Sequence, residues 1–377
     1  MSTSETVFYF LGHLPAQMLH GEALYRKLPG PCIVLSEDAK AYCEKRGLQT
    51  LLLDNHTVGY RPFKFRQVKN YTRFDFSEIP NTVNYLNRRH GIIFFFDTYP
   101  GINSLHSLKK IMLFHGNSIK VNWFQPWRIN CLKQYDKMTT LGPFWENILK
   151  KKGLPQDRFL KIGQTRCDEI ISLGSKPENQ EKIYARLSSR PKPILSYMPT
   201  WYGPSSLCDV GTALLRNVSD DFILMLRPHP ETPASILQEI NKTVRARKYM
   251  ILSHKDYDDS ISLMTMLSSS DAFIMDLSSL LIDCLLLDRP ILFAHGGNYF
   301  QTLWNRRVYR PIQEVFNRSE QITRLNVSSA DILIRKALSQ TPDKAARHCV
   351  KERFFYNLDG HAADKLVEAV KHDLVNL

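Results

Sequence analysis

The sequence predicts an α/β fold with two facing Rossmann-like domains, and three features support this prediction. Short apolar segments alternate with helical segments along the whole chain, a pattern that favours largely parallel sheets. The segment Gly174–Pro193 is polar and rich in Lys and Pro, so we predict that it links two such series. Polar residues follow several of the apolar segments, where open parallel sheets bind their ligands.

In the first half, six apolar segments are predicted as strands because each is short and bounded by turn or charged residues. One predicted helix ends in a lysine run before Gly153, as helix C-termini often do. The strands are Val7–Leu11, Cys32–Leu35, Thr50–Leu53, Ile92–Phe96, Ile111–Phe114 and Phe159–Ile162, and the helices are Ile79–Arg89, Phe144–Lys151 and Asp168–Leu173.

The second half repeats this alternation after the linker, which itself holds a helical stretch at Gln180–Leu187. The predicted strands are Ile194–Tyr197, Phe222–Leu226, Tyr249–Leu252, Ala272–Met275 and Ile291–Ala294, and the helices are Ala213–Arg216, Ala234–Ile240, Ile261–Leu267, an apolar helix that ends at Asp288, and Ala362–Leu377. We place the domains at residues 1–180 and 181–345, followed by a helical segment, 346–377, that packs back across them.

Composition restricts the class of protein. The chain has 377 residues, 43% of them hydrophobic and 23% charged, as in globular proteins of two domains. No segment approaches the roughly 20 apolar residues that span a bilayer, and the start lacks the basic region of a signal peptide. The seven cysteines show no paired spacing, which argues against a disulfide framework or a structural zinc site. We therefore expect a cytosolic chain.

The net charge of +13 indicates an anionic partner: nucleic acid, nucleotides or an acidic membrane face. The segment Tyr60–Phe74 interleaves aromatic and basic residues, which suits a membrane surface or single-stranded nucleic acid. A solvated loop whose aromatic rings pack into the core explains the same pattern equally well.

Polar residues follow the strands of the first half. His115, Gly116 and Asn117 come after Ile111–Phe114, and an imidazole there could accept a proton near neutral pH. A histidine that only hydrogen-bonds within its loop is an equal alternative. His13 and Asp97 also follow strands, and they are either residues of an acceptor groove or structural residues.

The second half carries similar signals. Arg227-Pro228-His229-Pro230 follows a strand, and the two prolines stiffen a backbone whose Arg suits bidentate contacts to phosphate. Thr200 and Trp201 follow another strand and offer a hydroxyl donor and a stacking face, although ordinary turn chemistry explains them too.

The segment after Ala272–Met275 predicts an anion site. Ser278 and Ser279 stand where a helix begins, so free N–H groups and hydroxyls would point at a ligand. Asp276 precedes them, and Asp283 lies one turn beyond Ser279 on the same helix face, where it either serves the ligand or bonds local groups. The Asp-x-Asp within Asp256–Asp259 favours helix capping over metal binding. The chain has no P-loop, dinucleotide fingerprint or nucleophile elbow.

These segments, in this order, resemble the CDP-glycerol glycerophosphotransferase family of teichoic acid and capsule polymer transferases. The matching stretches are Phe114–Gly116 with Lys120 nearby, Gly163–Asp168, Pro199–Thr200, Leu226–Pro230, Asp276–Ser279 with Asp283, Leu287–Pro290 and Asp359–Gly360.

The resemblance implies a glycosyltransferase-B fold and a peripheral enzyme at the inner face of the cell membrane. Such an enzyme moves a polyol phosphate, here glycerol phosphate, from a CDP-linked donor to a lipid-linked or polymeric glycan, and CMP leaves. No cofactor is obligatory, the need for a divalent metal stays open, and no nucleic acid partner is expected. The resemblance implies that His115 is the general base and that Arg227, His229, Ser278 and Ser279 hold the donor pyrophosphate. Together with the strand-end residues described above, the predicted catalytic residues are His115 and His229, the donor-binding residues are Gly116, Thr200, Arg227, Asp276, Ser278, Ser279 and Asp283, and the acceptor-groove residues are His13, Asp97 and Asn117.

The chain departs from the family pattern at some positions. Phe114 stands where the family usually has Trp, and no Asp follows Lys120 closely. Two other hypotheses therefore remain: a glycosyltransferase that uses a nucleotide-sugar, and, more remotely, a non-catalytic basic binder of nucleic acid or anionic lipid.

Overall fold

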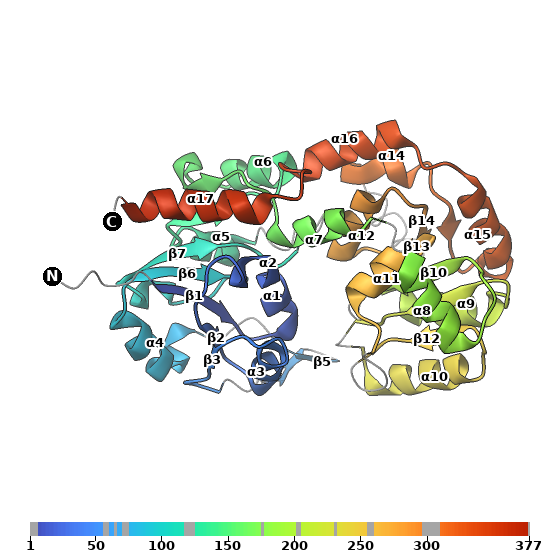
Figure 1. Ribbon diagram of the computed structural model, residues 1–377, viewed down its shortest axis with the longest axis horizontal. Helices are drawn as coiled ribbons and strands as arrows, with labels where there is room; N and C mark the ends of the chain where they lie inside the picture. The colour runs from blue at the N-terminus through green and yellow to red at the C-terminus, as the bar shows by residue number, and fades with distance from the viewer. Residues whose placement is uncertain are drawn as a thin grey trace. The chain divides into compact units, whose positions relative to one another are not determined.

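A computed structural model describes residues 7–55, 60–63, 66–69, 75–116, 125–174, 177–200, 205–229, 232–254, 260–295 and 310–375. The chain divides into two compact units. Unit 1 comprises Met1–Asn117, Val121–Glu169 and Arg353–Leu377, and unit 2 comprises Ser118–Lys120 and Ile170–Glu352. Each unit is built on a parallel sheet of its own (Figure 1).

Unit 1 contains a seven-stranded parallel sheet in the order β3-β2-β1-β6-β7-β8-β9. The chain runs outward from β1 to β3, returns to place β6 beside β1, and continues outward on the other side. Open α/β sheets bind their ligands where the strand order reverses in this way, here at the carboxyl ends of β1 and β6. The strands are β1 (Val7–Gly12), β2 (Cys32–Val34), β3 (Thr50–Leu51), β6 (Gly91–Phe95), β7 (Leu108–Met112), β8 (Lys137–Thr139) and β9 (Phe159–Leu160).

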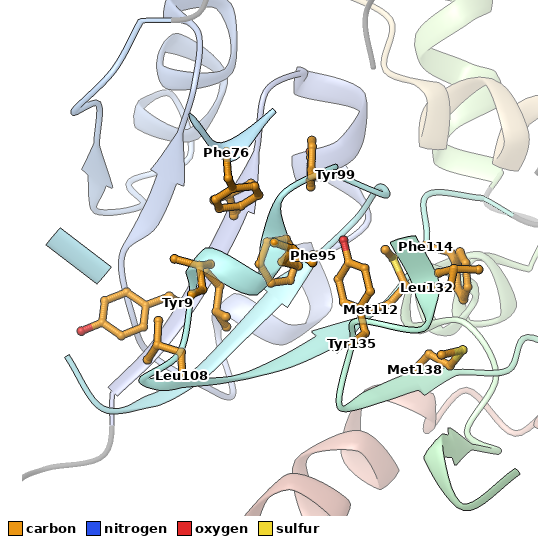
Figure 2. Close-up of a cluster of buried hydrophobic side chains, with 14 of the residues drawn as sticks. Tyr9, Phe76, Phe95, Tyr99, Leu108, Met112, Phe114, Leu132, Tyr135 and Met138 are labelled. Atoms are coloured by element: carbon orange, nitrogen blue, oxygen red, sulfur yellow. The ribbon is translucent and has the colours of Figure 1, made fainter. Parts of the chain in front are cut away.

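Both faces of this sheet are buried. Side chains alternate between the two faces of a strand, so neighbouring residues of one strand belong to different cores. Tyr9 and Phe95 belong to the core on one face, where the ring of Phe95 lies 6.1 Å from Tyr99 and 5.3 Å from Tyr135 between centroids (Figure 2). Phe10 and Phe94 belong to the core on the other face. This two-sided burial explains why these strands are uninterrupted apolar runs.

Helices cover the sheet of unit 1, and the last of them comes from the C-terminal end of the chain. Proline occupies the first turn of four helices, where its missing N–H costs no hydrogen bond. Leu366 and Val370 of the last helix join the core around Phe10. The helices are α1 (Pro15–Leu19), α2 (Glu22–Tyr25), α3 (Glu37–Glu44), α4 (Pro80–Asn87), α5 (Pro126–Leu132), α6 (Pro143–Lys151), α7 (Thr165–Leu173) and α17 (Ala362–Val375).

The carboxylate of Asp168 holds the start of α17. It accepts hydrogen bonds from the backbone N–H groups of Ala362 (2.9 Å) and Ala363 (2.7 Å). These donors have no partner within a helix, so the carboxylate satisfies them as a capping residue does. Burial raises the pKa of Asp168, although both bonds act in the opposite direction.

Unit 2 contains a six-stranded parallel sheet in the order β12-β11-β10-β13-β14-β15. The order reverses between β10 and β13, which is the second position where a ligand crevice is expected. The strands are β10 (Ile194–Met198), β11 (Ile223–Leu226), β12 (Met250–Leu252), β13 (Ala272–Met275), β14 (Ile291–Ala294) and β15 (Gln321–Ile322).

The helices of unit 2 are mostly short, and several pack on the sheet through the core formed by Leu195, Leu224 and Ile274. They are α8 (Pro177–Leu187), α9 (Gly211–Asn217), α10 (Ala234–Arg245), α11 (Leu263–Ser269), α12 (Ser279–Cys284), α14 (Gln313–Phe316), α15 (Ala330–Ser339) and α16 (Lys344–Phe354), the last reaching into unit 1 at its end. Among the described residues, no helix combines the length and apolar character that a membrane crossing needs.

One predicted strand has the wrong bounds, and one predicted helix is confirmed. The strand predicted at Ile111–Phe114 is β7, Leu108–Met112, and it includes two lysines because it pairs with β6 along its whole length. The helical stretch predicted at Gln180–Leu187 is confirmed as part of α8, which packs against α11: Asn179 bonds Ser268 (2.6 Å), and the Gln180 amide donates to the Ser269 carbonyl (3.0 Å).

Candidate active site

His115 lies just beyond β7 in an unusual turn. The residue before it, Phe114, has a φ of 61°, and Gly116 after it has a φ of 94°. Such a φ is rare for a bulky residue and costs about 1–3 kcal/mol. Phe114 is buried, with its ring 5.2 Å from that of Trp145, so core packing holds this backbone in place. The strained turn therefore sets the position of the imidazole.

One hydrogen bond defines the chemistry of His115. Its Nδ1 donates to the backbone carbonyl of Phe96 over 2.8 Å. Because a carbonyl oxygen only accepts, Nδ1 carries the proton in the neutral ring, and Nε2 carries the lone pair. The side chain is 31% exposed. His115 thus has the tautomer and the exposure that a general base needs.

Asp97 follows β6 and is fully buried beside His115. Its Oδ1 accepts from Arg128 Nη1 (2.9 Å) and from the backbone N–H of Thr98 (2.7 Å). Its Oδ2 lies 3.7 Å from His115 Nδ1 and accepts from the Gln17 amide over 3.4 Å. The carboxylate therefore joins three elements of unit 1 at the edge where β1 and β6 end.

His13 follows β1 and is also buried. Its Nδ1 lies 3.1 Å from the Tyr99 hydroxyl, and its backbone N–H donates to Gln17 Oε1 over 2.9 Å. Burial raises the pKa of Tyr99 well above its usual value, so the phenol stays a neutral donor. His13 and Asp97, predicted for the acceptor groove, thus belong to one network, and their side chains lie beneath the surface.

His20 lies beside His115, and no pattern in the sequence marks it as a candidate site residue. Its ring lies 6.4 Å from that of His115 between centroids. Arg166 Nη1 donates to its Nε2 over 3.2 Å, and the hydroxyl of Thr165 donates to its carbonyl over 2.9 Å. Arg166 and Thr165 come from the motif Gly163–Asp168, so in unit 1 this motif surrounds His20. Burial, and then the charges of Arg166 and His115, lower the pKa of His20 well below its usual value.

The stability of the fold is expected to fall as the pH drops below about 6.5 because of His20. In the unfolded chain this imidazole binds a proton below that pH, whereas the buried ring in the folded chain does not. Its contribution is therefore present above the unfolded pKa and is lost at lower pH, by up to about 1.4 kcal/mol per pH unit. Urea unfolding between about pH 5 and 8 should show a smaller loss for His20→Gln. The same change at exposed His106 should leave the slope unaltered, and equal slopes for both variants would contradict the assignment.

In unit 2, Asp276 connects the two strands at the reversal of the sheet. It follows β13, and its Oδ1 accepts from the backbone N–H of Thr200, just beyond β10, over 2.7 Å. Its Oδ2 accepts from the N–H and the hydroxyl of Ser206, each over 2.9 Å. The hydroxyl of Ser206 accepts in turn from Tyr197 over 2.7 Å. Asp276, only 2% exposed, therefore fixes the loop that carries Thr200.

Replacing Asp276 with Asn is expected to destabilise the protein by about 3 kcal/mol. An amide has one acceptor oxygen, so its NH₂ group would face a backbone N–H of Thr200 or Ser206. Urea unfolding measures this loss. The matched control is Asp288→Asn, which removes an exposed carboxylate paired with Lys351 (2.8 Å) and should change stability by less than about 1 kcal/mol. Equal losses for the two variants would show that the three bonds carry little stability.

Arg227 follows β11 and is held in one orientation. Its Nη1 donates to the hydroxyl of Ser253 over 2.7 Å, and that hydroxyl donates to the carbonyl of Ile261 over 3.0 Å. Ser253 follows β12, so it stands at the same edge of the sheet as Arg227. His229 is half-buried, and its carbonyl accepts from Thr232 over 2.9 Å. Both predicted donor-binding side chains therefore stand at the carboxyl edge.

Ser278 is the N-cap of α12: its hydroxyl oxygen accepts from the backbone N–H of Leu281 over 3.3 Å. Ser279 begins the helix and is half-buried. Asp283 is fully buried within the helix, so its side chain belongs to the interior of unit 2. The predicted helix continues as a 3-10 turn, Leu285–Leu287, and ends at Asp288, as expected from the sequence.

Some residues singled out in the sequence fall outside the described ranges: Asn117, Lys120, Trp201, Pro230 and Asp256–Asp259. Of Tyr60–Phe74, the structure describes the backbone of the antiparallel pair β4 (Tyr60–Phe63) and β5 (Arg66–Lys69). Within the described ranges, His, Cys, Asp and Glu side chains form no group of three or more that could hold a metal ion.

Residues 102–372 match the protein family described as CDP-glycerol:poly(glycerophosphate) glycerophosphotransferase. The teichoic acid glycerol-phosphate primase of Bacillus subtilis (strain 168) is 29% identical over 167 residues, which are 42% of this chain and 39% of the primase. The match therefore spans less than half of that relative.

Solved structures share the fold. The wall teichoic acid polymerase TagF has a TM-score of 0.61 and 15% identity, with 98% of this chain and 89% of that chain covered. A putative UDP-N-acetylglucosamine 2-epimerase from Listeria monocytogenes has a TM-score of 0.64 and 10% identity, with 100% and 98% covered. At such identities the likeness concerns the fold alone, and it confirms the predicted glycosyltransferase-B type with two Rossmann-like domains.

Proposed function

Since the chain belongs to the CDP-glycerol:poly(glycerophosphate) glycerophosphotransferase family, we propose that it transfers glycerol phosphate from CDP-glycerol to a hydroxyl group of a glycan acceptor and releases CMP. The family match confirms the resemblance that the sequence motifs indicate. The similarity to the teichoic acid glycerol-phosphate primase of Bacillus subtilis supports an acceptor of the teichoic acid type, either lipid-linked or polymeric.

The observation that carries this proposal is the tautomer of His115. With Nδ1–H bonded to the Phe96 carbonyl, Nε2 accepts the proton of the acceptor hydroxyl as its oxygen attacks the β-phosphorus of CDP-glycerol. The new P–O bond forms as the bond to the bridging oxygen breaks, and CMP leaves with that electron pair. The protein contributes mainly position and charge to this reaction, as in other phosphoryl transfers.

Unit 2 supplies the charge stabilisation in this proposal. Arg227 and His229 at the end of β11, with the hydroxyls of Ser278 and Ser279, are proposed to bind the pyrophosphate of the donor. The anchored guanidinium of Arg227 loses little freedom when it binds, which favours its contact with phosphate. Thr200 and Gly116 are proposed to line the donor site. Asp276 and the buried Asp283 are proposed to act by positioning the loop and helix around it.

Ser278 can be tested for anion binding separately from its capping role. Ser278→Asp keeps a good N-cap but adds a negative charge, so the free energy of unfolding should stay within about 0.5 kcal/mol of the wild type. Affinity for CDP-glycerol should fall at least about tenfold, because the carboxylate repels the pyrophosphate. Ser278→Asn, a neutral cap, is the matched control and should keep most of the affinity. Unchanged donor affinity in Ser278→Asp would contradict a phosphate contact at this residue.

The function itself is tested with a donor screen. Purified protein is given CDP-glycerol, CDP-ribitol, UDP-sugars or CMP-sugars, each with a lipid-linked disaccharide acceptor, and the released nucleotide is measured. Release of CMP from CDP-glycerol that requires the acceptor supports the proposal. Turnover confined to a nucleotide-sugar would favour a glycosyltransferase, and nucleotide release from no donor would favour a non-catalytic role.

We further propose that the enzyme meets its acceptor at an anionic membrane surface on the cytoplasmic side. The net charge of +13 supports this location, since basic proteins are attracted to acidic lipid headgroups. Sedimentation with vesicles is the measurement. Binding to vesicles that contain phosphatidylglycerol should exceed binding to neutral phosphatidylcholine vesicles and should weaken with salt, and equal binding to both would contradict the proposal.

A further inference from the structure

The buried carboxylate beside the proposed base has a role that the sequence motifs do not assign. We propose that Asp97 is a positioning residue that stabilises the positive charge on His115 when that imidazole takes the proton of the acceptor. The assignment rests on the proposed function, because it concerns a charge that exists only during transfer. It also revises the acceptor-groove role expected for Asp97, whose side chain is 0% exposed and so does not line an open surface.

The geometry separates two tasks around His115. The Phe96 carbonyl accepts the Nδ1–H bond over 2.8 Å and thereby sets the tautomer and the plane of the ring. Asp97 Oδ2 lies 3.7 Å from the same nitrogen, too far for a hydrogen bond but close enough for a strong charge interaction in a buried place. The carbonyl therefore orients the ring, and the carboxylate provides the negative charge.

The carboxylate is itself held in place from several sides. Arg128 Nη1 and the backbone N–H of Thr98 bond Oδ1 over 2.9 and 2.7 Å, and Gln17 donates to Oδ2 over 3.4 Å. The hydroxyl of Tyr135 donates to the Asp97 carbonyl over 3.0 Å. Such bonds keep the negative charge beside His115 with no reorganisation during the reaction, which is what electrostatic stabilisation needs.

The other charged groups around His115 make this carboxylate necessary. Arg128 forms an ion pair with Asp97. Arg166 donates a hydrogen bond to His20, whose ring centroid is 6.4 Å from that of His115. Both guanidinium groups oppose a positive imidazole. The Asp97 carboxylate, 3.7 Å from His115 Nδ1, carries the opposite charge and attracts a positive imidazole. Its loss would leave the new charge facing two arginines.

The expected fall in kcat for Asp97→Asn is moderate, because the Phe96 carbonyl orients His115 and Asp97 supplies only the negative charge. In serine proteases the carboxylate accepts the Nδ1–H bond and also sets the tautomer, and its replacement by an amide lowers kcat by about 10⁴-fold. Here the carbonyl sets the tautomer, so only the charge interaction is lost. We therefore expect Asp97→Asn to lower kcat by about 10- to 100-fold.

The first experiment measures steady-state transfer by the full chain and by Asp97→Asn. The expected result is the stated fall in kcat with a KM for CDP-glycerol that changes less than about threefold, since Asp97 acts after the donor has bound. Glu146→Gln is the matched control: Glu146 is a buried carboxylate of unit 1 paired with Lys150 and Lys161, and its loss should leave kcat unaltered. An unchanged kcat in folded Asp97→Asn would overturn the assignment.

A second measurement separates the charge role from an orienting role. Side-chain ¹⁵N NMR reports which nitrogen of His115 carries the proton, and the signal is assigned by its absence in His115→Gln. Asp97→Asn should keep the Nδ1–H tautomer, because the Phe96 carbonyl remains. A fall in kcat together with a switch of tautomer would overturn the charge role.

Asp97→Asn could fail to fold, since it leaves the Arg128 guanidinium without its carboxylate. Asp97→Asn/Arg128→Gln removes both charges and serves as the second variant. It should also lower kcat by at least about tenfold, and wild-type activity in it would overturn the assignment. Wild-type protein that releases no CMP from CDP-glycerol overturns the proposed function itself, whereas an active wild type with an equally active Asp97→Asn overturns the role of Asp97 alone.

Discussion

Replacing His115 with Ala is expected to lower kcat for glycerol phosphate transfer by about 10²- to 10⁴-fold. Without Nε2, the proposed acceptor of the hydroxyl proton is missing, so the hydroxyl must attack while still protonated. The Phe96 carbonyl keeps its place in the backbone, and the strained turn at Phe114 is held by packing against Trp145 rather than by the imidazole. The variant should therefore fold.

Measuring donor binding distinguishes the loss of the base from a general disruption of the active site. Affinity for CDP-glycerol, measured by calorimetry, should stay nearly unchanged in His115→Ala, since the polar contacts to its pyrophosphate are assigned to residues of unit 2. Added imidazole should restore part of the rate if the missing group is a base. His106→Ala, at an exposed histidine of the same unit, is the matched control and should keep full activity. Lost donor binding with a preserved kcat would contradict the role of His115.

Replacing Arg227 with Ala is expected to lower kcat/KM for CDP-glycerol by at least about 10²-fold, because the donor loses a charge-assisted contact to its pyrophosphate. The guanidinium is already oriented by Ser253 and Ile261, so little entropy is lost when the wild type binds. Arg227→Lys should recover only part of the loss, since an ammonium group cannot contact two phosphate oxygens in the same planar geometry.

The measurements for Arg227 are steady-state kinetics and the affinity of CMP and CDP-glycerol for each variant. Binding of CDP-glycerol should weaken more than binding of CMP, which lacks the second phosphate. Arg216→Ala removes an exposed arginine of α9 in the same unit and is the matched control. Equal weakening for CMP and CDP-glycerol would place the contact of Arg227 on the nucleoside or the α-phosphate instead.

The central strands of each sheet were predictable from the sequence, but the exact ends of some strands and the short outer strands were not. The strands Ala272–Met275 and Ile291–Ala294 have the predicted bounds, because a parallel strand buried on both faces must be an uninterrupted apolar run. β7 starts three residues earlier than predicted, at Leu108. Lys109 and Lys110 belong to the strand because they pair with β6, and this pairing between distant segments leaves no trace in local composition.

The polar segment around Asn179 and Gln180 shows what a correct local prediction leaves out. The sequence predicts a helix at Gln180–Leu187, but nothing local indicates that its amides bond Ser268, Ser269 and Asp271 across 89 to 91 residues of sequence. The short strands Lys137–Thr139 and Gln321–Ile322 also belong to the sheets, although no apolar run in the sequence predicts them. Hydrogen bonds formed in the folded chain, rather than local propensity, decide these two strands.

The sequence by itself determined the class of fold, the family and the residues at the ends of the central strands, because two-sided burial and strand-end chemistry each leave a local pattern. Only the tertiary structure decided which of these residues lie together. It placed Asp97 and His20 beside His115, bonded Asp276 to the backbone N–H of Thr200, and brought Ser253 to Arg227. These relations depend on distances between segments far apart in the chain, and such distances exist only once the sheets have formed.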